Sequence, residues 1–175
     1  ALAEAEIAYK ADGQLSGLTT GLTALDKSIS GLHHSDLIIV AGRPAMGKTT
    51  LAMNIAFNAA NAIYYGQANK NYKGAVLFFS LEMSHSQLAT RVLSSQCKVP
   101  ASVMREGSMT AEEMLKMSQY AEPISKIPLC IDDTPAMSVP MMRTRARRWA
   151  RKFGGVALIV VDYLQLMNGS GYSKG

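Results

Sequence analysis

Cysteine is scarce in this sequence, and no long apolar run is present. The only two cysteines, Cys97 and Cys130, lie far apart and form no CxxC pair, which argues against a disulfide framework. We expect both to be reduced, buried thiols. No apolar run approaches the roughly 18 residues of a membrane span, and residues 1–6 lack the basic start and apolar stretch of a signal peptide. These absences predict a cytoplasmic protein with no membrane partner, and the length of 175 residues suggests one domain.

Acidic residues are absent from the segment Arg143–Lys152, which holds six basic residues. Removing these six from the 18 basic residues of the chain leaves 12 against 13 acidic residues, so this segment carries the whole positive excess. Two rows of residues recur through it at helical spacing. The apolar row, expected to be buried, is Met142, Ala146, Trp149 and Phe153, and the basic row is Arg143, Arg147 and Arg151. The basic row is either a solvated or subunit-facing surface or a contact with nucleic acid.

Four continuous apolar runs have the length of strands. Polar residues do not alternate within them, which favours parallel strands covered on both faces. Helical patterns lie between the runs, and alternation of strands with helices predicts βαβ units. The predicted fold class is therefore α/β, with a mostly parallel sheet flanked by helices. The four predicted strands are Leu37–Ala41, Ala75–Phe79, Ile127–Ile131 and Val156–Val161.

Capping signals place the predicted helices. Capping boxes at Ser84 and Thr110 predict helices that end near Gln96 and Ala121. Ser138 is expected to cap the basic helix and Gly154 to end it. Short helices are also expected over residues 1–11 and over Thr23–Ile29. The three histidines, His33, His34 and His85, have no metal-ligand neighbours in the sequence and are expected to be structural or exposed.

The pattern GxxxxGK[ST] follows the first predicted strand and precedes an apolar helical pattern. Glycines let backbone N–H groups approach phosphate oxygens, and the helix N-terminus adds partial positive charge. Lys48 can supply an ammonium group to the β- and γ-phosphates, and Thr49 can supply a hydroxyl to Mg²⁺. We therefore predict a nucleoside triphosphate site with Mg²⁺. Its loop consists of Gly42, Arg43, Pro44, Ala45, Met46, Gly47, Lys48 and Thr49.

Two acidic residues follow predicted strands. Asp162 ends the last strand, where a P-loop ATPase holds its metal ion. Glu82 stands just past the strand Ala75–Phe79, at a sheet edge that opens onto the ligand crevice. A carboxylate there can polarise the water that attacks the γ-phosphate. The alternatives are a turn residue or helix cap at Asp162 and an ordinary surface acid at Glu82.

Together these segments resemble the motor domain of replicative DNA helicases of the DnaB family. Many P-loop proteins share the phosphate loop, so the resemblance depends on its combination with other stretches. These are residues 31–40, Ser80-Leu81-Glu82-Met83, residues 143–148 and Asp162-Tyr163-Leu164-Gln165-Leu166-Met167. The resemblance runs from about Leu15 to Met167, which is nearly the whole chain.

The resemblance implies a RecA-like P-loop NTPase core that binds ATP and Mg²⁺. It implies that Lys48 and Glu82 act in catalysis, that Thr49 and Asp162 hold the metal, and that Thr50 also meets the phosphates. Family members form homo-hexameric rings around single-stranded DNA, move 5′→3′ and work with primase and a helicase loader.

The family resemblance also implies a domain division, with a linker helix over residues 1–14 and the ATPase domain over residues 15–175. The family's motor domain continues well past the position of Asp162, with further strands, DNA-binding loops and an arginine finger. We therefore expect an incomplete motor domain that, alone, hydrolyses ATP slowly at best and does not unwind DNA.

Two other functions remain open. A RecA-type recombination or repair ATPase has the same core, although Glu82 within Ser-Leu-Glu-Met argues against it. The other is a nucleotide-gated assembly or regulatory module with little turnover. Strand separation, strand exchange and DNA-dependent ATP turnover distinguish the three.

Overall fold

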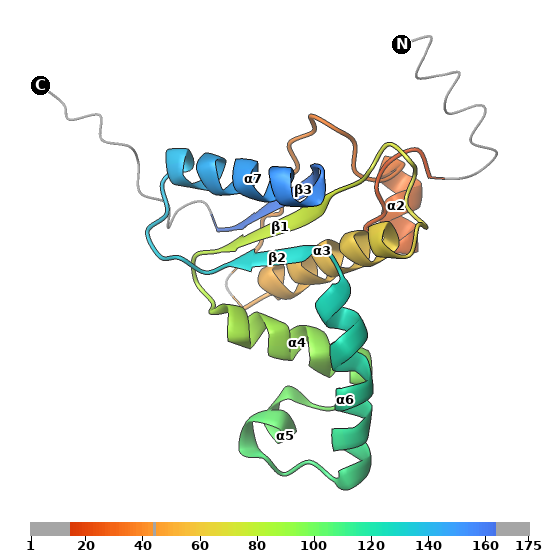
Figure 1. Ribbon diagram of the computed structural model, residues 1–175, viewed down its shortest axis with the longest axis vertical. Helices are drawn as coiled ribbons and strands as arrows, with labels where there is room; N and C mark the ends of the chain where they lie inside the picture. Colours follow the sequence, from red (N-terminus) through yellow and green to blue (C-terminus); the bar gives the residue numbers. More distant parts are fainter. Residues whose placement is uncertain (1–14, 44, 164–175) are drawn as a thin grey trace, which may run out of the picture.

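The chain folds around a parallel sheet flanked by helices (Figure 1), in a computed structural model that describes residues 15–43 and 45–163. The three strands are β1 (Ala75–Ser80), β2 (Leu129–Asp132) and β3 (Val156–Asp162), in the order β2-β1-β3. Both neighbours run parallel to β1, and Val76 pairs with Leu129 on one side and Leu158 on the other. Three of the four predicted strands are confirmed, and with them the α/β class.

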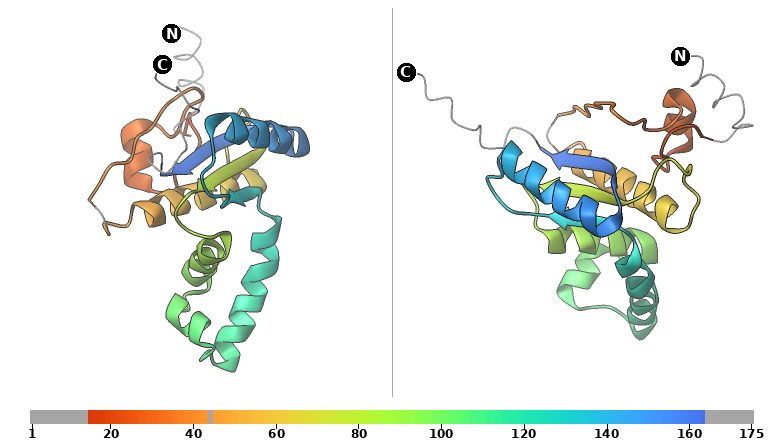
Figure 2. Two further views of the ribbon diagram at one scale, coloured as in Figure 1. Left: turned by 90° about the vertical axis from the view of Figure 1, so that its left-hand side faces the viewer. Right: turned by 45° about the horizontal axis from the view of Figure 1, so that its top comes forward.

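Strand β1 lies at the centre of the core, and all six of its residues are buried. Helix α3 (Lys48–Tyr64) covers one face of the sheet and α7 (Val139–Phe153) covers the other (Figure 2). Val76 and Phe78 belong to the cluster on the α3 side, whereas Leu77 and Phe79 belong to the cluster on the α7 side. This two-sided burial explains why the run is continuously apolar.

Three helices form an extension beyond the sheet (Figure 1): α4 (His85–Cys97), α5 (Ala101–Glu106) and α6 (Ala111–Lys126). The capping boxes predicted at Ser84 and Thr110 are both present. Helix α6 is longer than predicted because it continues through Pro123, which removes one backbone donor without ending the helix. The six-residue helix α5 is not among the predicted elements, since it is shorter than most sequence periodicities can reveal.

The short helix α2 (Thr23–Ile29) agrees with the prediction, and a buried carboxylate holds its first turn. Asp26 accepts hydrogen bonds from Thr19 Oγ1 (2.6 Å), Thr20 N–H (2.8 Å) and Thr20 Oγ1 (2.6 Å). Burial alone would raise the pKa of Asp26, but these hydrogen bonds outweigh it and lower the pKa below its ordinary value of 3.8. Asn58 of α3 donates to Thr20 O at 3.1 Å, which ties the segment to the main body.

The predicted strand Leu37–Ala41 is wrong. The segment has no regular secondary structure, and Leu37 and Ile39 are 85% and 76% exposed. Within the described residues β3 pairs only with β1, so the segment has not joined the open edge of β3. An apolar run favours burial, but pairing depends on partners distant in sequence, which the run itself does not specify.

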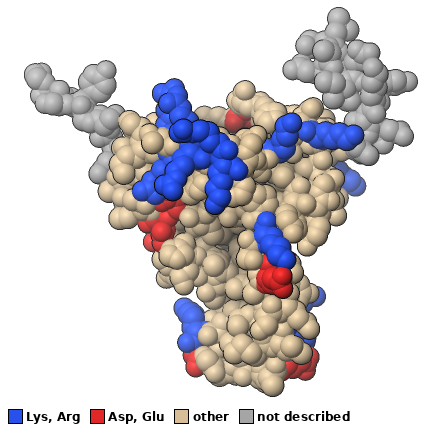
Figure 3. Space-filling view, in the orientation of Figure 1, with Lys and Arg blue, Asp and Glu red and all other residues tan. Residues whose placement is uncertain are grey.

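Helix α7 carries the basic segment, and its predicted limits are confirmed by the Ser138 cap and by Gly154. Met142, Ala146 and Trp149 pack against the sheet, but Phe153 is 36% exposed, so its predicted burial is wrong. Helical spacing identifies a face of the helix but not the point where the sheet beneath it ends. The basic row is exposed, and Figure 3 shows the basic side chains gathered over α7.

Both cysteines are free. Cys97 is buried as predicted, whereas Cys130 is only half-buried because β2 is an edge strand. Burial nevertheless raises the pKa of the Cys130 thiol. The helix predicted for residues 1–11, and with it the linker assigned to residues 1–14, lies outside the described residues.

Candidate functional site

The loop Gly42–Thr49 leads directly into the first turn of α3. Gly47 is the N-cap, with a φ of 81° in the left-handed region that favours glycine, and the helix begins at Lys48. Lys48 folds back over the loop and donates from Nζ to Gly42 O at 2.9 Å. A cavity of about 470 Å³ opens here, lined by Val40, Ala41, Gly42, Arg43, Met46, Gly47, Lys48 and Leu51. Pro44 lies outside the described residues.

This arrangement suits an anion. The first N–H groups of α3, a 17-residue helix, have no partner within the helix, and the helix dipole adds partial positive charge at the same end. Lys48 adds a full charge beside them. Its contact with Gly42 O involves only a neutral carbonyl, so a phosphate can compete for the ammonium group. The loop therefore has the chemistry of a phosphate site.

Polar residues gather where the three parallel strands end. The Cα partners in the last register position place Ser80 of β1 beside Asp162 of β3, and Asp132 of β2 beside Phe79. All three polar residues are buried. Asp132 is paired, because Arg145 Nη1 of α7 lies 2.6 Å from Asp132 Oδ2. Asp162 is different, since its Oδ2 atom is buried and, among the described residues, has no hydrogen-bond partner.

An unpartnered buried carboxylate oxygen is costly unless something else satisfies it. A divalent cation would do so, and oxygen ligands are those that Mg²⁺ prefers. Mg²⁺ at a phosphate site needs only one or two protein ligands, the rest being water and phosphate. Such a site does not require three or more His, Cys, Asp or Glu side chains, and no such cluster lies within residues 15–43 and 45–163. Asp162 therefore fits a magnesium site of this kind.

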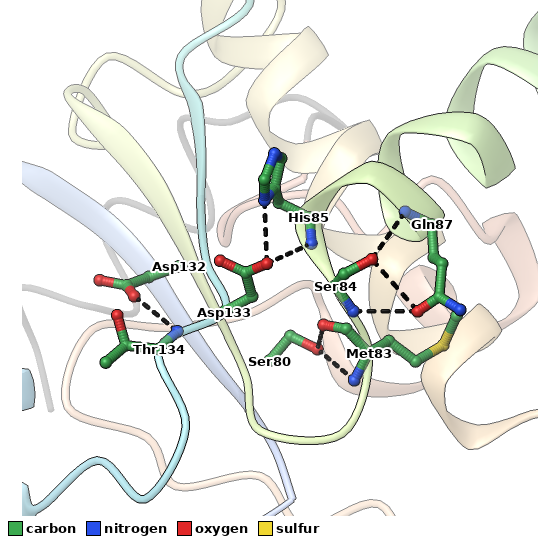
Figure 4. A network of polar contacts seen from close by, with 8 residues as sticks. All are labelled: Ser80, Met83, Ser84, His85, Gln87, Asp132, Asp133 and Thr134. Atoms are coloured by element: carbon green, nitrogen blue, oxygen red, sulfur yellow. Dashed lines mark hydrogen bonds and ion pairs between the residues drawn. The ribbon is translucent and has the colours of Figure 1, made fainter.

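Glu82 lies in the short loop between β1 and α4, with its side chain exposed. The hydroxyl of Ser80 closes this loop by donating to Met83 O (2.6 Å) and accepting from Met83 N–H (3.1 Å), as Figure 4 shows. Leu81 N–H donates to Asp162 O at 2.8 Å. These contacts fix the backbone on both sides of Glu82 and tie it to the end of β3.

Arg91, which no sequence pattern singled out, brings a cation to the start of α3. From the second turn of α4, Arg91 Nη1 donates to Thr50 Oγ1 at 2.9 Å. Thr50 directly follows Thr49 in the phosphate loop helix. The only available signal was the helical spacing from the Ser84 cap, which does not show what the far side of α4 faces.

The structure places the predicted residues in two groups. Lys48 lines the loop cavity, and Thr49 lies next to it at the start of α3. Glu82 and Asp162 both lie at the strand ends, where Leu81 N–H donates to Asp162 O, but neither lines that cavity. Arg91 links the groups, because it belongs to the helix that follows Glu82 and touches the helix that follows the loop.

No helix in the described part of the chain is both long enough and apolar enough to cross a bilayer. A comparison with protein families matches residues 17–175 to the DnaB-like helicase C-terminal domain. The chain is 42% identical to replicative DNA helicase DnaB of Rickettsia conorii, over 99% of this chain and 35% of that protein. It is also 42% identical to DnaB of Geobacillus stearothermophilus, over 97% of this chain and 35% of that protein. The chain thus spans about a third of the length of these relatives.

Solved structures give the same result for the fold. One of them, an ATPase domain, matches with a TM-score of 0.84 at 25% identity, over 99% of this chain and 59% of that one. A DnaB-like replicative helicase, solved in a study of its interactions with primase, matches with a TM-score of 0.83 at 25% identity, over 99% of this chain and 40% of that one. The fold is therefore the α/β RecA-like ATPase fold of these proteins. With the family match over nearly its whole length, the chain belongs to the DnaB-like replicative helicase family.

Proposed function

We propose that this chain is the nucleotide-binding part of a replicative DNA helicase motor, which uses Mg-ATP to move 5′→3′ on single-stranded DNA and unwind the duplex. The observation that carries the proposal is the loop Gly42–Thr49, which delivers Lys48 and free backbone N–H groups to one end of α3. The buried, unpartnered oxygen of Asp162 supports the metal part of the proposal.

Each site residue has a proposed role that follows from its chemistry. Residues Gly42–Thr50 cradle the phosphates, and Lys48 leaves Gly42 O to contact the β- and γ-phosphates. Thr49 and Asp162 hold Mg²⁺, which when bound offsets negative charge on the phosphates. Thr50 meets the phosphates through its backbone N–H.

Glu82 is proposed to accept a proton from the attacking water. Its side chain is exposed at the end of the strand next to β3, and its backbone is fixed by the Ser80 and Leu81 contacts. A fixed backbone with a free carboxylate suits a general base, because the group must meet a water that arrives with the substrate.

The proposed setting is a cytoplasmic homo-hexamer around single-stranded DNA, working with primase and a helicase loader. The family match supports this setting, as does the solved relative studied for its interactions with primase. The chain spans only about a third of its relatives, so these partners are proposed for the whole protein.

The decisive experiment compares forked DNA substrates with a 5′ tail or a 3′ tail, using the full-length protein and Mg-ATP. We expect unwinding of the 5′-tailed fork and ATP turnover that rises with single-stranded DNA. Strand exchange between homologous duplexes without fork unwinding would indicate a recombination ATPase instead. Tight ATP binding with turnover that DNA does not change would indicate a nucleotide-gated assembly module.

A further inference from the structure

His85 and Asp133 form a contact outside the group of residues proposed to bind and hydrolyse ATP. Asp133 Oδ2 accepts from the backbone N–H of His85 at 2.8 Å, and His85 Nδ1 lies 2.8 Å from the same oxygen (Figure 4). His85 is the first residue of α4, and Asp133 follows the last residue of β2. We call this pair the α4 latch. It joins the start of α4 to a strand end 48 positions away in sequence.

The α4 latch lies close to Glu82 along the chain. Only two residues, Met83 and Ser84, separate Glu82 from His85. Ser84 is tied to α4 by its capping box with Gln87, and Met83 is tied to Ser80 by two hydrogen bonds. Glu82 is therefore held from two sides, by β1 through the Ser80–Met83 bonds and by α4 through the latch, so a shift of His85 is passed to Glu82 through only two residues.

The same helix carries the second group at the site. Arg91, on α4, contacts Thr50 at the start of α3. Arg91 lies in the second turn of α4 and has its own anchor on Thr50. Loss of the latch should therefore displace the first turn of α4, and with it Glu82, while Arg91 and the phosphate loop keep their places.

The negative charge of Asp133 suits its place at the N-terminus of α4. The neighbouring Asp132 is already engaged by Arg145 of α7 and also accepts from Thr134 N–H at 3.1 Å. Asp133 instead faces the N-terminus of α4, where the helix dipole favours a carboxylate. The backbone N–H of His85, followed by its imidazole, lowers the pKa of Asp133. Two adjacent acids thus hold two different helices.

The latch lies largely in solvent, with side-chain exposures of 69% for His85 and 34% for Asp133. Exposed pairs of this kind contribute little to folding stability. Loss of the latch should therefore change the position of the first turn of α4 more than it changes whether the chain folds. A purely structural role predicts a loss of folding stability, whereas a positioning role predicts a loss of activity in a chain that still folds.

We propose that Asp133 is a positioning residue for ATP hydrolysis, which acts through the first turn of α4 to hold Glu82 against the nucleotide. The proposal deepens the function proposed above and rests on the role of Glu82 in that function. His85 contacts Asp133 twice, through its backbone N–H and through its imidazole.

The experiment measures ATP turnover and ATP affinity of Asp133→Ala in the full-length protein. We expect kcat to fall by about 10- to 100-fold, the effect of a small misplacement of a catalytic group. Affinity for a fluorescent ATP analogue should stay unchanged, because the phosphate loop does not contact Asp133. Asp133→Asn keeps an oxygen for the His85 N–H and should recover part of the rate. His85→Ala keeps that N–H and should also have the milder effect.

Thr110→Ala is the matched control, because Thr110 caps α6 as Ser84 caps α4 but lies away from the strand ends. It should leave kcat unchanged. The double variant Glu82→Gln with Asp133→Ala tests the route of the effect. If Asp133 acts through Glu82, the double variant should be no slower than Glu82→Gln alone.

Two outcomes would overturn the proposal. One is wild-type kcat in Asp133→Ala while Glu82→Gln is slow, which leaves the role of Glu82 intact and removes that of Asp133. The other is an Asp133→Ala effect that multiplies fully with that of Glu82→Gln, which would place Asp133 on a separate route. Normal turnover in Glu82→Gln itself would instead overturn the proposed role of Glu82, and this inference with it.

Discussion

Arg145 and Asp132 join α7 to the end of β2 through a contact of 2.6 Å between Arg145 Nη1 and Asp132 Oδ2. The carboxylate is almost fully buried, with a side-chain exposure of 4%, whereas the arginine is 40% exposed. Arg145 lies between the exposed residues Arg143 and Arg147 on the same helix. One residue of the basic segment therefore neutralises a buried acid, while its neighbours face solvent.

Replacing Arg145 with Met should destabilise the fold, because it leaves the buried Asp132 carboxylate without its cation. Removing one partner of a buried pair costs about 3–5 kcal/mol, and partial exposure of Arg145 puts the expected loss at about 2–3 kcal/mol. Urea unfolding followed by circular dichroism measures it. Arg147→Met is the control on the solvent side and should change stability by no more than about 0.5 kcal/mol. Equal midpoints for the two variants would contradict a structural role for Arg145.

The strands show how far apolar patterning can predict this fold. The prediction for the run Ala75–Phe79 is confirmed because both faces of β1 are buried, so every position must be apolar. The run Leu37–Ala41 is just as apolar, yet the segment is exposed and unpaired in the described structure. The pattern reports a preference for burial. Which strand a run pairs with depends on contacts between distant parts of the chain.

The candidate site likewise contains residues that sequence patterns can identify and residues that they cannot. Lys48, Thr49 and Asp162 belong to local patterns in which residue type, spacing and the adjoining element all appear in the sequence. Arg91 and Asp133 have no such pattern. Their partners, Thr50 and His85, lie 41 and 48 positions away, and only the packing of α4 against α3 and the place of its first residue beside the end of β2 bring them together.

Asp26 should make the stability of the chain depend on acid pH. Its pKa is lowered in the folded state by hydrogen bonds from Thr19 and Thr20, which outweigh the effect of burial. A lowered folded-state pKa gives a stabilisation that is fully present above the ordinary value of 3.8 and is lost as pH falls through the folded-state value. Asp26→Asn should lower stability by about 2 kcal/mol at neutral pH, the scale of hydrogen bonds to a charged group.

The measurement is the free energy of unfolding of wild type and Asp26→Asn at several pH values from neutral to strongly acidic. The difference between them should begin to shrink near pH 3.8, where Asp26 of the unfolded chain takes up a proton, and should disappear as the pH falls through the lower folded-state pKa. Asp36→Asn, which changes an exposed acid, should follow the wild-type curve. A difference that stays constant down to the lowest pH would show that the loss in Asp26→Asn is not due to charge.

Lys48→Ala should abolish tight triphosphate binding. The ammonium group donates to Gly42 O and lies beside the free N–H groups at the start of α3, so its loss removes the charge that would meet the β- and γ-phosphates. Titration with a fluorescent ATP analogue measures the affinity. Lys70→Ala removes an exposed lysine far from the loop and should bind as wild type does. Unchanged affinity in Lys48→Ala would remove the proposed role of the loop.

Glu82→Gln should keep ATP binding and slow hydrolysis in the full-length protein. The amide preserves the size of the side chain, and the backbone contacts of Ser80 and Leu81 do not involve the carboxylate, so the loop should keep its shape. What is lost is the negative charge that accepts a proton from water, and general-base assistance is typically worth about 10²–10⁴-fold. Single-turnover hydrolysis measures this step without interference from product release.

Glu106→Gln, which neutralises an exposed acid on α5, should hydrolyse ATP at the wild-type rate. If Glu82→Gln and Glu106→Gln turn over equally fast, the proton acceptor is another group, and Asp162 is the carboxylate to test next because its Oδ2 atom is buried at the adjoining strand end.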